Sequence, residues 1–391
     1  MKPINRYLLP TFQEDLREKM VFVSGPRQVG KTTLARQVLQ RQPGLYLNWD
    51  NQGDRKTILQ GLWPPEPVLI VLDELHKYRK WKSHLKGEFD RHRDKHTFLV
   101  TGSARLNIYR RGGDSLQGRY HSHRLHPFSL CEVLGERRLI EPGKTLKIPH
   151  EIPQEKKILQ DLFAYGGFPE PYMKADARFH RRWQKEHLDR VIAEDVRDLS
   201  NVADLSSLQI LAELLPARAG SLLSLNNLRE DLEVSHRAIS HWMELFEQLY
   251  YCYRLPPYAG RLSQTLRKER KLYLWDWSTL EDPGARFENM IAGHLLKFCH
   301  FMEDTEGYNI QLHYIRDKSK REVDFLVTYN KKPWFAVEAK GSLGRDHHLR
   351  YFGERLSIPQ LFYVFMEGKA DYEKDGVIYT SAGRFLHALG I

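Results

Sequence analysis

The residues with the clearest chemical meaning form a glycine-rich loop at residues 25–32, Gly-Pro-Arg-Gln-Val-Gly-Lys-Thr. The loop lies between an apolar run of strand length at 20–24 and a helical pattern at 32–40. In this context backbone N–H groups and a helix N-terminus surround anionic phosphates. Gly30 allows close approach of the backbone, Lys31 reaches the β and γ oxygens, and the Thr32 hydroxyl is placed to ligate Mg²⁺. The sequence therefore predicts a site for ATP and Mg²⁺.

Two carboxylates follow the apolar run at residues 68–72 and complete this predicted site. Asp73 and Glu74 emerge at the carboxyl edge of a predicted parallel sheet, where α/β folds place ligands. We expect Asp73 to hold Mg²⁺ through water and Glu74 to polarise the attacking water, which predicts hydrolysis. A solvated acidic pair is the alternative. The predicted nucleotide-binding residues are Gly25, Pro26, Arg27, Gln28, Val29, Gly30, Lys31, Thr32, Thr33 and Asp73.

Polar and basic residues follow the next apolar run, at residues 97–101. Ser103 stands where a hydroxyl would sense the γ-phosphate. One of the arginines further along the chain could reach the γ-phosphate of a neighbouring subunit as an arginine finger, although a solvated surface position is equally compatible with each of them. These arginines are Arg110, Arg111 and Arg119, and Arg105 closely follows Ser103.

A second constellation lies near the C-terminus. Asp324 falls on one predicted strand, and Glu338 and Lys340 fall two apart on the next, so these two share a face. Asp324 and Glu338 offer hard oxygen ligands for a divalent cation, Mg²⁺ or Mn²⁺, while Lys340 could activate water and stabilise a pentacovalent phosphate. The arrangement is similar to the PD-(D/E)XK nuclease motif, in which Glu288 would be the helical glutamate. A half-exposed strand with an ion pair is the alternative.

The elements that must position these residues follow from hydrophobic patterns. Short apolar runs at 45–49, 68–72 and 97–101 are typical of buried parallel strands. Residues 132–200 are charged and helical, and residues 208–255 contain three apolar-periodic stretches with helix-turn-helix spacing. The candidate recognition helix begins after Ser235 as N-cap, and an equally open alternative is that it only packs against protein. Its contact residues would be His236, Arg237, Ser240 and His241. Strand and helix patterns beyond 271 predict a second α/β domain, where Arg316 and Arg321 could hold phosphates.

Composition limits the class of protein. The formal net charge of +10 favours a polyanionic partner such as nucleic acid, although a basic surface kept for solubility is compatible with it. The three cysteines are far apart, so neither a disulfide framework nor a zinc ribbon is indicated. No stretch approaches the roughly 20 apolar residues of a membrane-spanning helix, and the N-terminus lacks a signal-peptide pattern. We expect a soluble, cytoplasmic protein with no membrane partner.

Several segments together resemble a large family of prokaryotic AAA+ ATPases with an appended C-terminal domain of unknown function. The matching segments are residues 25–33, 72–75, 101–104, 116–119, 125–129, 166–170 and 287–289. The resemblance implies an α/β protein with a P-loop AAA+ ATPase core (1–135), a helical lid and connector (136–205), a winged-helix segment (206–260) and a restriction-endonuclease-like domain (261–391). It also implies a ring of identical subunits, a hexamer being one form, and makes Arg119 the preferred inter-subunit arginine.

Three functions are compatible with these patterns. The first is an ATP-driven enzyme in which a metal-dependent deoxyribonuclease acts on DNA, in genome defence or the control of mobile elements. The second is a nucleotide-switched DNA-binding or scaffold protein whose nuclease fold does not cleave. The third is a protein-remodelling ATPase, which unfolded protein rather than DNA would stimulate.

Overall fold

A computed structural model describes residues 4–102, 116–150, 152–196, 204–258, 269–341, 346–366 and 371–391. The chain divides into two compact units, one of Met1–His126 with Gln248–Tyr250 and one of Pro127–Glu247 with Tyr251–Ile391. The four-part division predicted from the sequence stays a prediction. No helix in the described ranges is long and apolar enough to cross a membrane. Ser103, Arg105, Arg110 and Arg111 lie outside the described residues.

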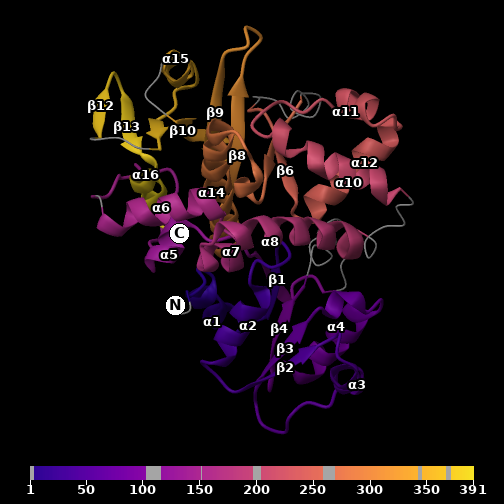
Figure 1. The fold of residues 1–391 in the computed structure, drawn as a ribbon. Coiled ribbons are helices and arrows are strands. Elements are labelled where there is room, and N and C mark those ends of the chain that lie inside the picture. The colour runs from indigo at the N-terminus through magenta and orange to yellow at the C-terminus, as the bar shows by residue number, and fades with distance from the viewer. Residues whose placement is uncertain are drawn as a thin grey trace. The chain divides into compact units, whose positions relative to one another are not determined.

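The N-terminal unit is built on a five-stranded sheet with the order β2-β3-β4-β1-β5. All its strand pairs are parallel, so their carboxyl ends meet at one edge. Strands β1, β3 and β4 are almost entirely buried, which explains their continuous apolar runs. Figure 1 shows these strands in indigo and violet with α4 beside them. The strands are β1 (Met20–Ser24), β2 (Gly44–Asn48), β3 (Leu69–Asp73), β4 (Thr97–Thr101) and β5 (Tyr120–Arg124).

Helices connect these strands and cover the sheet. The helix after the glycine-rich loop begins one residue earlier than its apolar pattern predicts, because Gly30 in a left-handed conformation serves as its N-cap. Trp81, Leu85 and Phe89 of α4 pack into the same core as the strands. The helices are α1 (Leu9–Asp15), α2 (Lys31–Leu39), α3 (Gln52–Gln60), the 3₁₀ turn η1 (Leu75–Lys77) and α4 (Trp81–His92).

The C-terminal unit contains a mixed six-stranded sheet with the order β12-β13-β11-β10-β9-β8. Strands β10, β11 and β13 pair in parallel, whereas β8, β9 and β10 pair antiparallel. The expected α/β class therefore holds for this unit too. Its strands are β8 (Ile310–Arg316), β9 (Glu322–Tyr329), β10 (Lys332–Lys340), β11 (Gln360–Phe365), β12 (Tyr372–Lys374) and β13 (Val377–Ser381).

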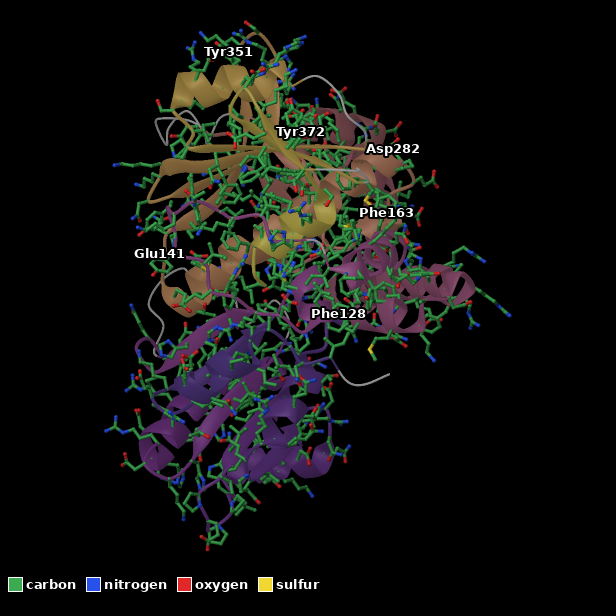
Figure 2. All side chains as sticks on the ribbon, turned by 90° about the vertical axis from the view of Figure 1, so that its left-hand side faces the viewer. Phe128, Glu141, Phe163, Asp282, Tyr351 and Tyr372 are labelled. Atoms are coloured by element: carbon green, nitrogen blue, oxygen red, sulfur yellow. The ribbon has the colours of Figure 1, made fainter. Side chains whose placement is uncertain are left out.

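Three helices pack against this sheet. The longest is α14 (Pro283–Glu306), which extends well beyond the predicted 286–299 because Asp282 caps its N-terminus and Gly307 ends it. It contacts β8, β9 and β10, while α15 (His347–Leu356) contacts β9, β10 and β11 and α16 (Ala382–Ala388) contacts β11 and β13. Figure 1 shows α15 and the strands beside it, and Figure 2 labels Tyr351 on that helix.

The part of the chain that follows β5 and precedes β6 is mainly helical. Residues 136–150, which we expected to be helical, form neither helix nor strand. The helices are α5 (Leu130–Leu134), α6 (Pro153–Tyr165), α7 (Pro169–Lys174), α8 (Ala177–Arg190), the π-helix η4 (Val191–Val196), α10 (Leu205–Leu214), the 3₁₀ turn η5 (Pro216–Arg218), α11 (Leu225–Asp231) and α12 (His236–Gln248).

The predicted helix-turn-helix segment is followed by a small antiparallel pair of strands. Strand β6 (Cys252–Leu255) pairs with β7 (Lys271–Leu274), and Leu222 makes an isolated bridge to Lys271. A 3₁₀ turn, η6 (Trp277–Thr279), follows β7. Along the chain, β6 follows the helical segment, and β7 and η6 precede α14. The assignment of this segment as a winged helix stays a prediction.

Asn289 of α14 fixes the position of β7. Its side-chain oxygen accepts from the Leu274 N–H at 2.8 Å, and its amide donates to the Leu274 carbonyl at 2.8 Å. Asn289 is fully buried. The pair of bonds satisfies both backbone groups of Leu274, which water could not reach.

The substitution Asn289→Ala should lower the free energy of unfolding of the C-terminal unit by about 2 kcal/mol or more, because it strands a buried N–H and a buried C=O. Chemical denaturation followed by far-UV circular dichroism measures the effect. Glu306→Ala, at the exposed last residue of the same helix, is the control and should change stability little. Equal effects of the two substitutions would contradict this role for Asn289.

Candidate functional site

The glycine-rich loop of the N-terminal unit connects β1 to α2. Gly25 and Gly30 have φ values of 156° and 97°, and Gln28 has a φ of 60°. A Cβ atom at Gly25 would collide with the Leu125 carbonyl oxygen, so no other residue fits there without a shift of the backbone. The loop thus has the backbone that glycine permits, and it leads into the N-terminus of α2, where the first N–H groups of a helix can bind an anion.

Lys31, the first residue of α2, is buried and turned into the loop. Its ammonium group donates to the carbonyl oxygens of Gly25 at 3.0 Å and Pro26 at 2.8 Å. The charge therefore lies within the curve of the loop, as the predicted contact with β and γ phosphate oxygens requires.

Asp73, at the carboxyl end of β3, binds three hydroxyl groups. Its Oδ2 accepts from Thr32 at 2.8 Å and from Tyr46 at 2.6 Å, and its Oδ1 accepts from Thr101. Burial and the neighbouring Asp73 carboxylate raise the pKa of Tyr46 to about 12, so Tyr46 remains a donor. The Thr32 hydroxyl and the Asp73 carboxylate are adjacent oxygen ligands, and this pair fits the predicted Mg²⁺.

Glu74 follows Asp73 in a left-handed conformation with φ of 58°. Its N–H donates to the Thr101 carbonyl at 3.0 Å, which fixes the residue at the same edge of the sheet. Its Oε2 lies 3.5 Å from Lys77 Nζ. Burial raises the pKa of Glu74 above its ordinary value despite the opposing charges of Lys31 and Lys77. A raised pKa suits a carboxylate that takes a proton from water.

Arg119, the preferred inter-subunit arginine, makes a bidentate salt bridge with Asp90 of α4. Nε and Nη2 lie 2.8 and 3.1 Å from the two carboxylate oxygens. In an inter-subunit role, Arg119 would either separate from Asp90 or be held in position by it. The structure holds one chain, so the role of Arg119 stays a prediction.

The second constellation gathers in the C-terminal unit as its spacing predicts. Lys340 Nζ lies 2.9 Å from Asp324 Oδ2 and 3.0 Å from Glu338 Oε1. The Ala339 N–H also donates to Asp324 Oδ2 at 3.0 Å, which ties β9 to β10 at this point. The second oxygen of Glu338 is buried and has no hydrogen-bond partner among the described residues.

A second lysine, which the sequence analysis did not single out, lies in the same cluster. Lys271 Nζ is 2.6 Å from Glu322 Oε1, 3.2 Å from Glu288 Oε1 and 3.5 Å from Asp324 Oδ1. Tyr273 donates to Glu288 Oε1 at 2.8 Å. Lys271 thus bridges Glu288 and Asp324, in the place where the predicted nuclease site would have a metal ion.

Burial and mutual repulsion dominate the electrostatics of these carboxylates. Burial and the nearby Asp324 raise the pKa of Glu288 to about 7 and that of Glu338 to about 8. Burial would also raise the pKa of Asp324, but Lys271 and Lys340 outweigh it and hold that pKa below its usual value. Asp324 is therefore the carboxylate that keeps its charge.

The donor set of this cluster does not fit a divalent cation. No group of three or more His, Cys, Asp or Glu side chains in the described part of the chain is placed to hold a metal ion. Both oxygens of Asp324 already face lysine ammonium groups. The predicted ligation of Mg²⁺ or Mn²⁺ by Asp324 and Glu338 would require at least one lysine to move.

The two arginines expected to hold phosphates near this cluster have partners within the protein. Arg316 Nη1 lies 2.6 Å from Glu322 Oε2. Arg321 binds Asp317 at 2.7 Å, and its guanidinium lies 3.8 Å from the centre of the Tyr351 ring. These contacts use only some of the five N–H donors of each guanidinium, so the predicted phosphate role of both residues stays a prediction.

Two helices present polar faces that could meet nucleic acid. On α12 the Ser235 hydroxyl accepts from the Ala238 N–H at 3.1 Å, as expected of an N-cap. His236, Arg237 and His241 are exposed there, so Arg237 is the one permanent cation, and Glu244 shares the exposed surface.

The helix α8 carries a denser positive charge, which the sequence analysis missed although the spacing was visible. Four exposed cations recur at i, i+3, i+4 and i+7, one face of a helix. None of them has an ion-pair partner among the described residues. They are Arg178, Arg181, Arg182 and Lys185.

Comparison with known proteins assigns the N-terminal part. Residues 17–134 match the family model of an AAA domain, and residues 156–281 and 283–385 match two domains of unknown function, DUF8612 and DUF4143. The chain therefore has an AAA domain at its N-terminus, and the expectation of an AAA-type P-loop ATPase is confirmed. The matches give no support to a nuclease.

Relatives add distant similarity. The chain is 22% identical to an uncharacterized protein of Methanocaldococcus jannaschii over 82% of this chain and 74% of that protein. It is 21% identical to an uncharacterized protein of Mycobacterium tuberculosis over 89% of this chain and 77% of that protein.

Two solved structures resemble parts of the chain weakly. The Aeropyrum pernix Orc1 protein in complex with DNA matches with a TM-score of 0.33 and 14% identity, over 73% of this chain and 90% of that one. A RuvB variant of Thermotoga maritima matches with a TM-score of 0.31 and 16% identity, over 64% and 89%. Scores this low establish no shared function.

Substitutions at the ATP site should separate binding from hydrolysis. Lys31→Ala should weaken ATP binding by about 10- to 100-fold, because it removes a charged phosphate contact. Glu74→Gln should retain ATP binding and lower kcat by about 100-fold or more, because it removes the base. Equilibrium binding of a fluorescent ATP analogue and steady-state phosphate release measure the two effects.

Lys56→Ala, at an exposed position of α3, is the control for both measurements. ATP affinity that survives Lys31→Ala would remove Lys31 from the phosphate contact. Unchanged turnover in Glu74→Gln would remove Glu74 from the role of base.

Proposed function

We propose that this protein is a nucleotide-switched DNA-binding ATPase, in which the state of the ATP site controls how the C-terminal unit engages DNA. The observation that carries the ATPase is the hydrogen bond of Thr32 to Asp73, which joins the phosphate-binding loop to the end of β3. The C-terminal carboxylate cluster is not required to cleave in this function.

Each residue of the ATP site has a distinct task in the proposed reaction. The backbone N–H groups of residues 27–33 and the Lys31 ammonium bind the β and γ phosphates. Mg²⁺, held by Thr32 and Asp73, would neutralise charge on the β and γ oxygens. Glu74 accepts a proton as water forms a bond to the γ-phosphorus, and the bond from that phosphorus to the bridging oxygen breaks to release ADP. Ser103 would contact the γ-phosphate.

The DNA partner is supported by the charge of the chain and by the α8 stripe, defined as Arg178, Arg181, Arg182 and Lys185. The stripe spans eight residues, and the seven steps from its first to its last residue cover about 10 Å of helix, roughly three nucleotides of one DNA strand. Exposed cations without ion-pair partners in the described part of the chain can neutralise DNA phosphates, because no existing ion pair has to break first. The proposed DNA-binding surface also includes, as a smaller part, the predicted contact residues of α12. These residues are His236, Arg237, Ser240 and His241.

A membrane surface is a less suitable partner for α8. A helix that lies in a bilayer interface needs an exposed apolar face opposite its cations. On α8 that face is buried, since Trp183 stacks on His187 with ring centroids 4.7 Å apart and also contacts Phe168. The exposed cations of the stripe are therefore better suited to bind an anionic polymer such as DNA through electrostatic attraction.

Replacing the α8 stripe with Gln at all four positions should weaken binding to duplex DNA by about tenfold or more and should make the slope of log affinity against log salt shallower by up to about 3 to 4. Fluorescence anisotropy over a range of salt concentrations measures both. Gln retains helix propensity, so α8 should stay folded.

The matched control removes four exposed lysines at other places in the same unit. Lys318, Lys320, Lys331 and Lys332, changed together to Gln, alter the formal net charge of +10 by the same amount. Equal losses in the two variants would mean that only total charge matters and would contradict a specific role for α8.

A metal-dependent deoxyribonuclease is the competing function, and one observation favours it. Asp324, Glu338, Lys340 and Glu288 lie in one cluster, as the resemblance to PD-(D/E)XK nucleases implies. Such an enzyme would use Mg²⁺ or Mn²⁺ and would suit genome defence or the control of mobile elements. The donor set described above argues against this metal.

Cleavage assays decide between these functions. Labelled single- and double-stranded DNA and RNA, incubated with Mg²⁺ or Mn²⁺ with and without ATP, should remain intact, while DNA should stimulate ATP hydrolysis. Cleavage that disappears in Lys340→Ala would establish the nuclease instead. ATP hydrolysis stimulated by unfolded protein and not by DNA would favour a protein-remodelling ATPase.

The proposal includes an assembly of identical subunits in the cytoplasm. AAA+ ATPases commonly act as rings, and Arg119 is the residue we propose to reach a neighbouring subunit's γ-phosphate in a ring such as a hexamer. Its pairing with Asp90 would keep the guanidinium oriented at the surface until a neighbouring subunit binds.

A further inference from the structure

Lys271 has an unusual position for a lysine. Its side chain is only 3% exposed, and its ammonium group contacts Glu288 of α14 and both Glu322 and Asp324 of β9. Three carboxylates from two elements therefore converge on one nitrogen atom. A protein needs a cation at such a point, because buried carboxylates repel one another strongly.

The fold holds the Lys271 backbone in place. Lys271 is the first residue of β7, where it pairs with Leu255 of β6 and also bridges Leu222. Asn289 clamps the other end of the same short strand through Leu274. The lysine is therefore fixed from both ends of β7, unlike Lys340, whose side chain is 42% exposed and can withdraw toward solvent.

The contacts of Asp324 show which ligands an incoming metal would find. Its Oδ1 faces Lys271, and its Oδ2 accepts from Lys340 and from the Ala339 N–H. A divalent cation beside Asp324 Oδ1 would stand within contact distance of a buried ammonium group, and two like charges so close together repel. Withdrawal of Lys340 alone would not relieve this repulsion.

We propose that Lys271 is the resident cation of this carboxylate cluster and that it excludes a divalent metal from the site. Its ammonium group joins α14 to β9, as a metal ion would in a metal-dependent site, and it leaves no room for a second cation at Asp324 Oδ1. The inference deepens the non-cleaving role proposed above, and its test uses metal binding alone.

The substitution Lys271→Met tests the proposal directly, because Met keeps the apolar stem and removes the charge. The variant should gain one Mn²⁺ site per chain, because without the ammonium group the side chains of Glu288, Asp324 and Glu338, which as they stand form no metal-binding group, can close around an ion. Mn²⁺ titration followed by electron paramagnetic resonance, with full-length protein free of nucleotide, counts bound ions. Mn²⁺ should also raise the unfolding temperature of this variant and not that of the wild type.

Two further variants serve as controls. Lys340→Met removes the exposed lysine and should gain no Mn²⁺ site, and Asp324→Asn in the Lys271→Met background should lose the new one. Lys271→Arg keeps a cation and should continue to exclude Mn²⁺. The Arg variant and the wild type provide a readout even if Lys271→Met does not fold.

Either of two results would overturn the proposal. One is a wild-type protein that binds Mn²⁺ in a manner abolished by Asp324→Asn, which needs no Lys271 variant to be observed. The other is a folded Lys271→Met protein that gains no Mn²⁺ site. Neither result touches ATP hydrolysis or DNA affinity, so the ATPase and the DNA-binding role are judged separately.

Discussion

A single buried carboxylate, that of Asp73, connects the parts of the ATP site. It accepts hydrogen bonds from Thr32 of α2, Tyr46 of β2 and Thr101 of β4, so four elements meet at one acidic group. Three donors also explain how a carboxylate that is only 2% exposed is tolerated there, since burial without partners would be costly. A cation bound between Thr32 and Asp73 would replace the hydrogen bond that joins the loop to β3. The same group therefore supports the fold and offers a route for sensing the nucleotide.

The N-terminal unit was predictable because its sequence signals are local. A loop that needs positive φ values requires glycine at 25 and 30, and a parallel strand buried on both faces requires a continuous apolar run such as 69–72. Strand order along the sheet was not predictable, because parallel pairing depends on contacts far apart in sequence. Ser103 and two of the three candidate arginines, Arg110 and Arg111, fall outside the described residues, so their roles stay predictions.

The C-terminal unit shows the limits of motif spacing. Asp324, Glu338 and Lys340 come together as the two-residue period of strands requires, and α14 supplies Glu288. Lys271 belongs to no recognised spacing, because its approach to the cluster depends on β7 pairing with β6 and on the Asn289 clamp. Strands β8, β11 and β13 were also missed, since short apolar runs do not distinguish strand from buried helix. A complete set of motif residues therefore did not reveal the charge balance that decides what the cluster can bind.

We propose that the nucleotide at the ATP site controls engagement of DNA. The most direct measurement is the affinity of Glu74→Gln protein for duplex DNA with ATP and Mg²⁺ compared with ADP and Mg²⁺, because slow hydrolysis keeps the ATP state populated. We expect the two DNA affinities to differ by about fivefold or more, and by linkage we expect DNA to change the ratio of ATP to ADP affinity by the same factor. Equal DNA affinities in the two nucleotide states would contradict it.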